Sequence, residues 1–251
     1  MRPTLYGLPH TRTMRVRWLL AELQMVQGRD FELEEVPLLD ASPTSLNINP
    51  NCKQPFFVDA DGTKVFESLA INTYLIDSYG GASPLAPRSK AEKAALYTWS
   101  MWAATELDMR VWEGMMLTDG MARINHPVAN DAAFRAYFGR ERSAERSERI
   151  LAELESGPLP ALNAALAGKQ WLCGERFTAT DLNVSAVAWW LKLLHADERV
   201  LRPFANLGRW LKAATGRPVF QALARESKAA DRAGLFKLSK GASFEARYGT
   251  L

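Results

Sequence analysis

Short strand-like runs and helical spacings alternate through the first part of the chain. Residues 3–7 form an apolar run that ends at a glycine and predicts a strand. Apolar residues then recur at helical spacing and predict a helix that begins near Thr11 to Thr13; they are Val16, Leu19, Leu20 and Leu23. Residues 31–38 alternate in part and predict a second strand, so the chain opens with a βαβ unit of parallel strands.

A hairpin and a further helix are predicted next. Residues 40–51 are polar and contain two prolines, which indicates a loop with at most a short helix. Strand-like runs at 56–58 and 64–66 flank Asp61-Gly62, a pair typical of hairpin turns. A helix is predicted from Glu67-Ser68 onward by the spacing of Ile71, Tyr74, Leu75 and Ser78. The resulting order, β-α-β-α-β-β-α, is the one a thioredoxin-like domain requires.

The pattern changes after the glycine- and proline-rich segment at 80–88. No strand is indicated beyond it, whereas residues 89–119 and 131–155 have the spacing of amphipathic helices, and Gly157-Pro158 is a helix stop. The predicted fold class is therefore α/β plus all-α. Its expected parts are a thioredoxin-like domain at 1–80, a linker at 81–88, an all-helical bundle domain at 89–228 and an irregular tail at 229–251.

Composition narrows the function classes. The 251 residues are 47% apolar and 24% charged, which is ordinary for a globular protein. The formal net charge of +3 is small and the basic residues are spread along the chain, which argues against nucleic acid as the main partner. Because there is neither a long apolar run nor a signal-like N-terminus, we expect no membrane association and a cytoplasmic protein.

The spacing of the two cysteines indicates neither a redox motif nor a metal site. Cys52 and Cys173 lie far apart and no Cys-x-x-Cys occurs, so we expect free thiols in a reducing compartment and neither a disulfide framework nor a metal site. Cys52 lies three residues before Pro55, and we interpret it as a partly buried small residue in a loop rather than as a redox group.

Ligand-binding features gather at the ends of the predicted hairpin. Pro55 opens the first strand, where a cis peptide bond can turn the main chain of Gln54 outward and leave a strand edge for a peptide-like ligand. Glu67 and Ser68 begin the following helix, whose unpaired N–H groups and positive dipole end suit a carboxylate.

These residues, with the continuation through Tyr74-Leu75, resemble the glutathione-binding domain of the glutathione S-transferases. The resemblance implies that the Gln54 main chain, before a cis Pro55, pairs with the cysteinyl part of glutathione. It also implies that Glu67 and Ser68 hold the γ-glutamyl end, with Lys53 near the glycine carboxylate.

A second resemblance lies in the loop after the first strand. The run Thr11-Arg12-Thr13-Met14-Arg15-Val16-Arg17-Trp18 is similar to a bacterial family pattern in which a serine hydroxyl, here replaced by Thr11, contacts the glutathione sulfur. Thr11 is therefore the candidate catalytic residue, with Thr13 and His10 as alternatives. The opposing interpretation is that Thr11 is a helix N-cap. We expect Arg12 and Arg15 to be solvated helix residues, although either can add to the field at the sulfur.

The helical part contains a further family-like signature. Thr178 and Asp181 form a Thr-x-x-Asp capping box ahead of an apolar run, similar to the buried capping box of the transferases, and its expected role is structural. We expect Trp99, Trp102, Trp189 and Trp190 in the core rather than in a pocket. Methionines suited to a broad apolar pocket lie on the first long helix; they are Met101, Met109, Met115 and Met116.

The resemblance implies a homodimeric glutathione S-transferase with glutathione as co-substrate and no other cofactor. Its thiolate would attack an apolar electrophile held by the helical domain. Two alternatives stay open: a glutathione-dependent disulfide oxidoreductase on the same fold, and a non-catalytic glutathione-binding or chaperone-like protein.

Overall fold

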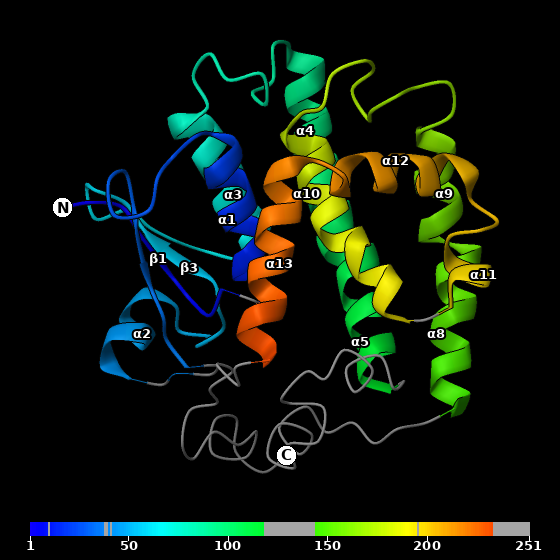
Figure 1. Cartoon of the computed structure of the whole chain (residues 1–251), viewed down its shortest axis with the longest axis horizontal. Helices are drawn as coiled ribbons and strands as arrows, with labels where there is room; N and C mark the ends of the chain where they lie inside the picture. The colour runs from blue at the N-terminus through cyan, green and yellow to red at the C-terminus, as the bar shows by residue number, and fades with distance from the viewer. Residues whose placement is uncertain (10, 38–39, 41, 118–143, 195, 233–251) are drawn as a thin grey trace. The chain divides into compact units, whose positions relative to one another are not determined.

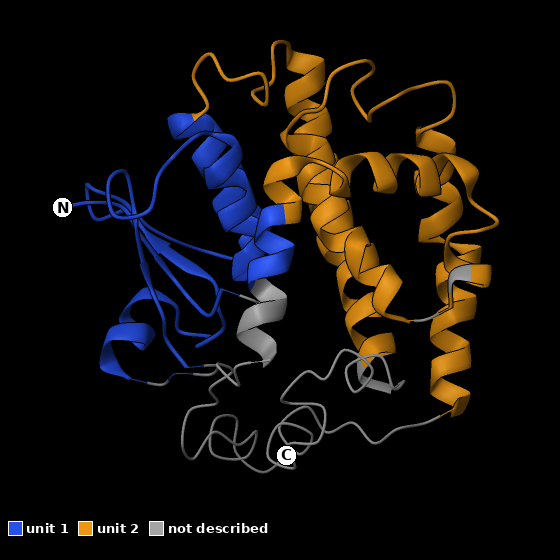
Figure 2. Ribbon diagram, viewed as in Figure 1, with its two compact units in different colours: residues 1–79, 125–140, 222–251 blue, residues 80–124, 141–221 orange. Residues whose placement is uncertain are grey.

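The computed structural model describes residues 1–251 except 10, 38–39, 41, 118–143, 195 and 233–251. The chain divides into two compact units, coloured separately in Figure 2. The first holds Met1–Tyr79 and the described residues from Ala222 onward. The second holds the described residues between Gly80 and Gln221.

The first unit is a mixed four-stranded sheet with helices, in the strand order β2-β1-β3-β4. β1 and β2 pair in parallel, and the other pairs are antiparallel. This confirms the predicted thioredoxin-like arrangement. Its elements are β1 (Thr4–Tyr6), α1 (Thr13–Glu22), β2 (Glu32–Glu34), α2 (Pro43–Ile48), β3 (Phe56–Val58), β4 (Lys64–Phe66) and α3 (Ser68–Tyr79).

Alternation along the central strands gives this sheet two apolar faces. Leu5 and Phe57 are paired across β1 and β3, and both are fully buried. Their neighbours Tyr6 and Phe56 stack with ring centroids 4.9 Å apart and belong to a cluster that includes Ile48 of α2. Helices α1 and α3 lie side by side (Figure 1).

The predicted hairpin is present, and a buried carboxylate ties it to α3. Gly62 has φ 90°, and the Asp59 N–H donates to the Thr63 carbonyl at 2.8 Å to close the turn. The Asp59 side chain is only 6% exposed and accepts hydrogen bonds from the hydroxyls of Tyr74 and Tyr79. The hydrogen bond to Asp59 and partial burial raise the pKa of Tyr74.

In the second unit, the described residues form helices and one isolated β-bridge, between Trp171 and Gly174. The helices are α4 (Lys90–Trp102), the π-helical turn η1 (Ala103–Asp108), α5 (Met109–Leu117), α8 (Ala144–Ser156), α9 (Pro158–Ala165), α10 (Ala179–Ala188), the 3₁₀ turn η3 (Trp189–Leu194), α11 (Asp197–Val200), α12 (Ala205–Thr215) and α13 (Pro218–Arg232). The last of these continues from Ala222 onward in the first unit.

Most predicted boundaries of this helical part agree with the structure. The expected helix at 89–119 is the run from α4 through η1 to α5. The described part of the helix expected at 131–155 is α8, which stops before Gly157 as predicted, and its earlier residues lie outside the described ones. Every residue of α10 is buried, and the Asn183 amide donates to the Ser100 hydroxyl at 2.8 Å, so α10 is a core helix.

Helix α13 extends into the segment that we expected to be irregular from residue 229. It begins at Pro218, a favoured first helical residue, and continues to Arg232 because no glycine or proline interrupts that run. Residues 233–251 of the expected tail lie outside the described residues. On this helix the Glu226 carboxylate accepts two hydrogen bonds from Arg17 of α1, at 2.8 and 2.9 Å.

Candidate functional site

Strand register brings three loop ends of the first unit together. Phe56 is paired with Phe66, so the residues before β3 and those after β4 lie at the same end of the hairpin. Phe56 is also paired with Tyr6, which puts the loop after β1 at that end as well. The sheet thus gathers the candidate residues Thr11, Lys53, Gln54, Pro55, Glu67 and Ser68 at one end.

The Gln54–Pro55 peptide bond is cis, as the resemblance implied. Both residues are buried, while Lys53 is exposed. Within the described part of the chain, no hydrogen bond occupies the main-chain N–H or carbonyl of Gln54. This peptide edge can therefore pair with an extended ligand in the manner of an added strand.

The side chain of Gln54 has a structural function that the sequence did not indicate. Its Oε1 accepts from the Leu8 N–H, and its Nε2 donates to the Val36 carbonyl at 3.3 Å. The amide therefore links the loop after β1 to the end of β2. The space beside it is so tight that a Cβ atom at Gly7, where φ is 145°, would collide with Gln54 Oε1 and the Thr13 hydroxyl.

A backbone distortion marks the junction of β4 and α3. Glu67 has φ 72°, a left-handed conformation that is uncommon for residues other than glycine and costs about 1 kcal/mol. Its side chain is exposed, whereas Ser68, the first residue of α3, is 5% exposed. The first N–H groups of α3 have no partner within the helix, so the junction suits an anion.

A buried arginine lies behind this junction. Arg15 of α1 is 4% exposed, and its Nη1 lies 3.5 Å from Ser68 Oγ. Our expectation that Arg15 is a solvated helix residue is therefore wrong. It projects toward α3, which packs against α1, instead of toward water. Arg12, in contrast, is half-buried.

The hydroxyl of Thr11 is already engaged within the loop. It donates to the Leu8 carbonyl at 2.9 Å, accepts from the Thr13 N–H at 3.3 Å, and lies 3.0 Å from the Thr13 hydroxyl. The residue at the N-cap position is Arg12, whose side chain makes no capping bond. Thr11 therefore supports the start of α1 from one position earlier. A hydroxyl has one proton, so the Thr11 hydroxyl can donate to a sulfur only if it breaks its hydrogen bond to the Leu8 carbonyl.

The alternatives to Thr11 differ in their access to a ligand. Thr13 is fully buried, and of the two threonines only Thr11 retains exposed surface. His10 lies outside the described residues. Cys52 lies in a loop, as expected, with φ 48°, but at 4% exposure it is more deeply buried than we expected. No group of His, Cys, Asp and Glu suited to a metal ion occurs among the residues that were described.

In the second unit the predicted capping box is present and buried. The Thr178 N–H donates to Asp181 Oδ2 at 3.1 Å, and Asp181 Oδ1 accepts from the Leu172 N–H at 2.8 Å and from the Trp210 indole at 2.9 Å. Burial raises the pKa of Asp181, and these hydrogen bonds oppose that rise. Its role is therefore structural, as we expected.

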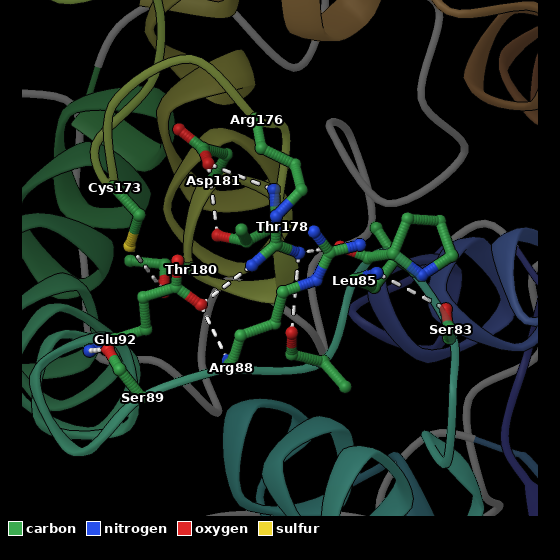
Figure 3. A network of polar contacts seen from close by, with 12 residues as sticks. Ser83, Leu85, Arg88, Ser89, Glu92, Cys173, Arg176, Thr178, Thr180 and Asp181 are labelled. Carbon is green, nitrogen blue, oxygen red and sulfur yellow. Dashed lines mark hydrogen bonds and ion pairs between the residues drawn. The ribbon is translucent and has the colours of Figure 1, made fainter.

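Figure 3 shows a polar network around Arg176 that the sequence did not reveal. The guanidinium donates to the carbonyls of Pro84 and Ala86, and to the Glu92 carboxylate at 2.6 Å. Glu92 also accepts from the Arg88 N–H at 2.6 Å. The segment that we expected to be a linker is thus attached to the loop before α10.

The four tryptophans are less buried than we expected, and the exposure of the methionines varies along the first long helix. The four tryptophans expected in the core are all half-buried; they are Trp99, Trp102, Trp189 and Trp190. Met115 is buried, whereas Met101 and Met109 are about half exposed, at 52% and 51%. No helix in the described residues is both long and apolar enough to cross a membrane.

Two family models match the chain. The N-terminal domain model of glutathione S-transferases covers residues 1–77, and the C-terminal domain model covers 126–218. A glutathione S-transferase domain-containing protein of Dictyostelium discoideum is 33% identical over 211 residues, which is 82% of this chain and 73% of that protein. Glutathione S-transferase GstA of Escherichia coli O157:H7 is 27% identical, over 77% of this chain and 85% of that protein.

The matches also include proteins with another name. Elongation factor 1-gamma of Carassius auratus is 26% identical over 81% of this chain, and the match spans only 41% of the elongation factor. Among solved structures, glutathione transferase URE2P5 of Phanerochaete chrysosporium gives a TM-score of 0.75 at 22% identity, covering 93% of this chain and 97% of that one. URE2P6 of the same organism, in complex with oxidized glutathione, gives 0.70 at 20% identity, covering 91% and 97%.

Proposed function

Because the chain belongs to the glutathione S-transferase family, we propose that it is a transferase that conjugates glutathione to an electrophilic small molecule. The observation that carries the proposal is the convergence at one end of the sheet. A cis peptide edge at Gln54–Pro55, the start of α3 at Glu67–Ser68 and the loop of Thr11 lie together there. These are the groups that a γ-glutamyl tripeptide with a thiol requires.

In this proposal each part of glutathione has its own partner. The cysteinyl unit pairs with the main chain of Gln54, whose hydrogen-bonding groups have no other partner in the described structure. The γ-glutamyl amine and carboxylate bind Glu67 and the Ser68 helix start, and Lys53 approaches the glycine carboxylate. Charge complementarity supports this arrangement, because an acid faces the ligand amine and a helix N-terminus faces its carboxylate.

The reaction requires the sulfur to be ionised. A free thiol with a pKa of about 8.5 is only a few per cent thiolate at neutral pH, and each unit of lowering needs about 1.4 kcal/mol. Donation from Thr11 together with the N-terminus of α1 can supply one to two units, roughly, by the strength of charge-assisted hydrogen bonds. The thiolate then forms a carbon–sulfur bond, and the leaving group departs with its electron pair.

The present hydrogen bonding of Thr11 favours a second candidate function. Its oxygen lies 2.9 Å from the Leu8 carbonyl and 3.4 Å from Gln54 Oε1, so these acceptors compete with a sulfur for its one proton. A site with a weaker donor for the sulfur suits attack on a disulfide. There the thiolate displaces one sulfur to form a mixed disulfide, and a second glutathione completes the reduction. A non-catalytic glutathione-binding or chaperone-like protein is the third candidate, because the chain also matches proteins that are named elongation factor 1-gamma and not transferase.

The proposal extends to a cytoplasmic homodimer. Exposed apolar side chains along the helix from α4 to α5 support an interface there; Tyr97, Met101 and Met109 are 40%, 52% and 51% exposed. Sedimentation equilibrium measures this directly, and a species of 28.0 kDa at all concentrations would contradict the dimer.

Calorimetric titration with reduced and with oxidised glutathione, followed by two activity assays, tests the function. The assays use a chloronitrobenzene and a small disulfide on the same preparation. Binding with conjugation supports the transferase, and binding with disulfide reduction alone supports the second candidate. Binding without either turnover supports the third candidate, and no binding contradicts all three.

A further inference from the structure

The feature that carries the inference is the contact between Arg15 and Ser68 within the first unit. Arg15 is 4% exposed and Ser68 is 5% exposed, and Arg15 Nη1 lies 3.5 Å from Ser68 Oγ. Arg15 is on α1 and Ser68 begins α3, two helices packed against each other in Figure 1. A permanently charged group is therefore held behind the first residue of the proposed ligand-binding helix.

The chemistry of the pair fixes which of the two groups donates the hydrogen bond. A guanidinium only donates hydrogen bonds, so in this contact the Ser68 oxygen is the acceptor. Its own proton is then left to donate to another group. The guanidinium charge also adds to the positive end of the α3 dipole, and both effects favour an anion at this helix start.

We propose that Arg15 is a positioning residue that makes this site selective for the α-carboxylate of a γ-glutamyl ligand. The inference rests on the proposed function, because it assigns the carboxylate of glutathione to the Ser68 helix start. Arg15 acts through Ser68, whose hydroxyl it orients, and through its charge. It is not required to touch the ligand.

Arg17 provides a matched comparison on the same helix. It is also buried, at 9% exposure, but it makes two hydrogen bonds to the Glu226 carboxylate. The difference from Arg15 is that Arg17 has no hydrogen bond to Ser68 in the described structure. Arg17→Met therefore removes a buried guanidinium from α1 but not the contact between Arg15 and Ser68.

The test compares two ligands in the full-length protein. The first is S-methylglutathione, in which the sulfur cannot ionise. The second is the same compound with a hydrogen in place of the γ-glutamyl α-carboxylate. Calorimetry gives a selectivity ratio, which is the dissociation constant of the carboxylate-free compound divided by that of S-methylglutathione. The ratio is measured for the wild type and for Arg15→Met, Arg15→Lys and Arg17→Met, and circular dichroism checks that each variant folds.

We expect the ratio to fall about tenfold or more in Arg15→Met, which corresponds to one charge-assisted hydrogen bond. The carboxylate-free ligand should bind wild type and Arg15→Met alike, Arg15→Lys should recover part of the ratio, and Arg17→Met should keep it. An Arg15→Met variant that weakens both ligands equally, or keeps the wild-type ratio, overturns the inference while the proposed function stands. Failure of the wild type to bind S-methylglutathione overturns both.

Discussion

The indole N–H of Trp210 donates a hydrogen bond to Asp181 Oδ1 at 2.9 Å, in the interior of the second unit. Asp181 also accepts from the main-chain N–H groups of Leu172 and Thr178, and it is fully buried. One carboxylate thus satisfies donors from three separate segments of the chain. Its removal leaves all of them without an acceptor.

We therefore expect Asp181→Ala to lower the free energy of unfolding by about 3 kcal/mol or more, since each buried unsatisfied donor costs about 1–3 kcal/mol. Urea denaturation measures this loss. Glu198→Ala is the control, because it removes one partner of an exposed ion pair with Arg202 and should change stability by less than about 1 kcal/mol. Equal effects of the two substitutions would show that Asp181 does not organise the helical core.

Substitutions at Gly7 and Gly28 distinguish the energetic cost of backbone strain from the cost of a steric collision. Both have positive φ, 145° and 82°, but only Gly7 lies against other side chains, those of Thr13 and Gln54. Gly28→Ala should cost about 1 kcal/mol for the left-handed backbone alone. Gly7→Ala should cost clearly more and weaken glutathione binding, because Gln54 and the loop after β1 must move. Thermal unfolding and calorimetry measure the two effects, and equal losses of stability would contradict the collision.

The carboxylate of Glu92 predicts a pH dependence of stability. Hydrogen bonds from the Arg88 N–H and from Arg176 hold the pKa of Glu92 below its usual range, against partial burial. The stabilisation is therefore fully present above the unfolded-state pKa, about 4.3, and is lost as the pH falls through the lower folded-state value. The stability difference between wild type and Glu92→Gln should shrink on acidification from about pH 5 to pH 3. A difference that does not change with pH would contradict the assignment.

Substituting Glu67 by glycine is expected to have opposite effects on the stability of the fold and on the affinity for glutathione. Its left-handed φ of 72° favours glycine, so Glu67→Gly should stabilise the fold or leave it unchanged, whereas Glu67→Ala keeps the strain. Both variants lose the carboxylate proposed to bind the γ-glutamyl amine and should weaken glutathione binding about tenfold or more. Calorimetry and denaturation on the same samples separate the two effects. Unchanged affinity in both variants would remove Glu67 from the site.

Thr11 predicts a change in the ionisation of bound glutathione. Thr11→Val removes the hydroxyl at nearly constant size and should raise the pKa of the bound thiol by about one unit or more, while Thr11→Ser should not raise it. Ultraviolet titration of the thiolate in the complex measures this pKa. If the valine variant titrates like the wild type, the hydroxyl of Thr11 only supports the loop through Leu8 and Thr13.

Local pattern was sufficient for the elements of the fold. Asp61-Gly62 marked the hairpin, Gly157-Pro158 marked the end of α8, and Thr178 with Asp181 marked the start of α10, because each signal lies within a few residues of the feature it predicts. The irregular tail was expected to begin at residue 229, but α13 continues to Arg232, because neither a glycine nor a proline lies between these positions.

The local sequence pattern could not predict polar contacts between residues that lie far apart in the chain. Arg15 has the local pattern of a surface residue, yet it is buried against Ser68, which lies 53 positions later. Arg176 meets Glu92 across 84 positions, and the Gln54 amide meets Val36 and Leu8. The chain topology decides which distant polar groups meet, so only the folded structure reveals these partners.

The π-helical turn at Ala103–Asp108 affects how the chain tolerates changes of length. Such turns arise where one extra residue is accommodated inside an α-helix. In a regular α-helix each residue turns the chain by about 100°, so one extra residue would rotate everything after it by that amount. The π turn absorbs the extra residue, and Val111 and Met115 of α5 stay buried. Deleting one residue within the turn should therefore restore a regular α-helix with the same buried face, whereas the same deletion inside α5 would rotate the residues that follow it. A relative without the turn is expected to align with a one-residue gap at this point, and a graft of α5 between the two proteins must carry the gap with it.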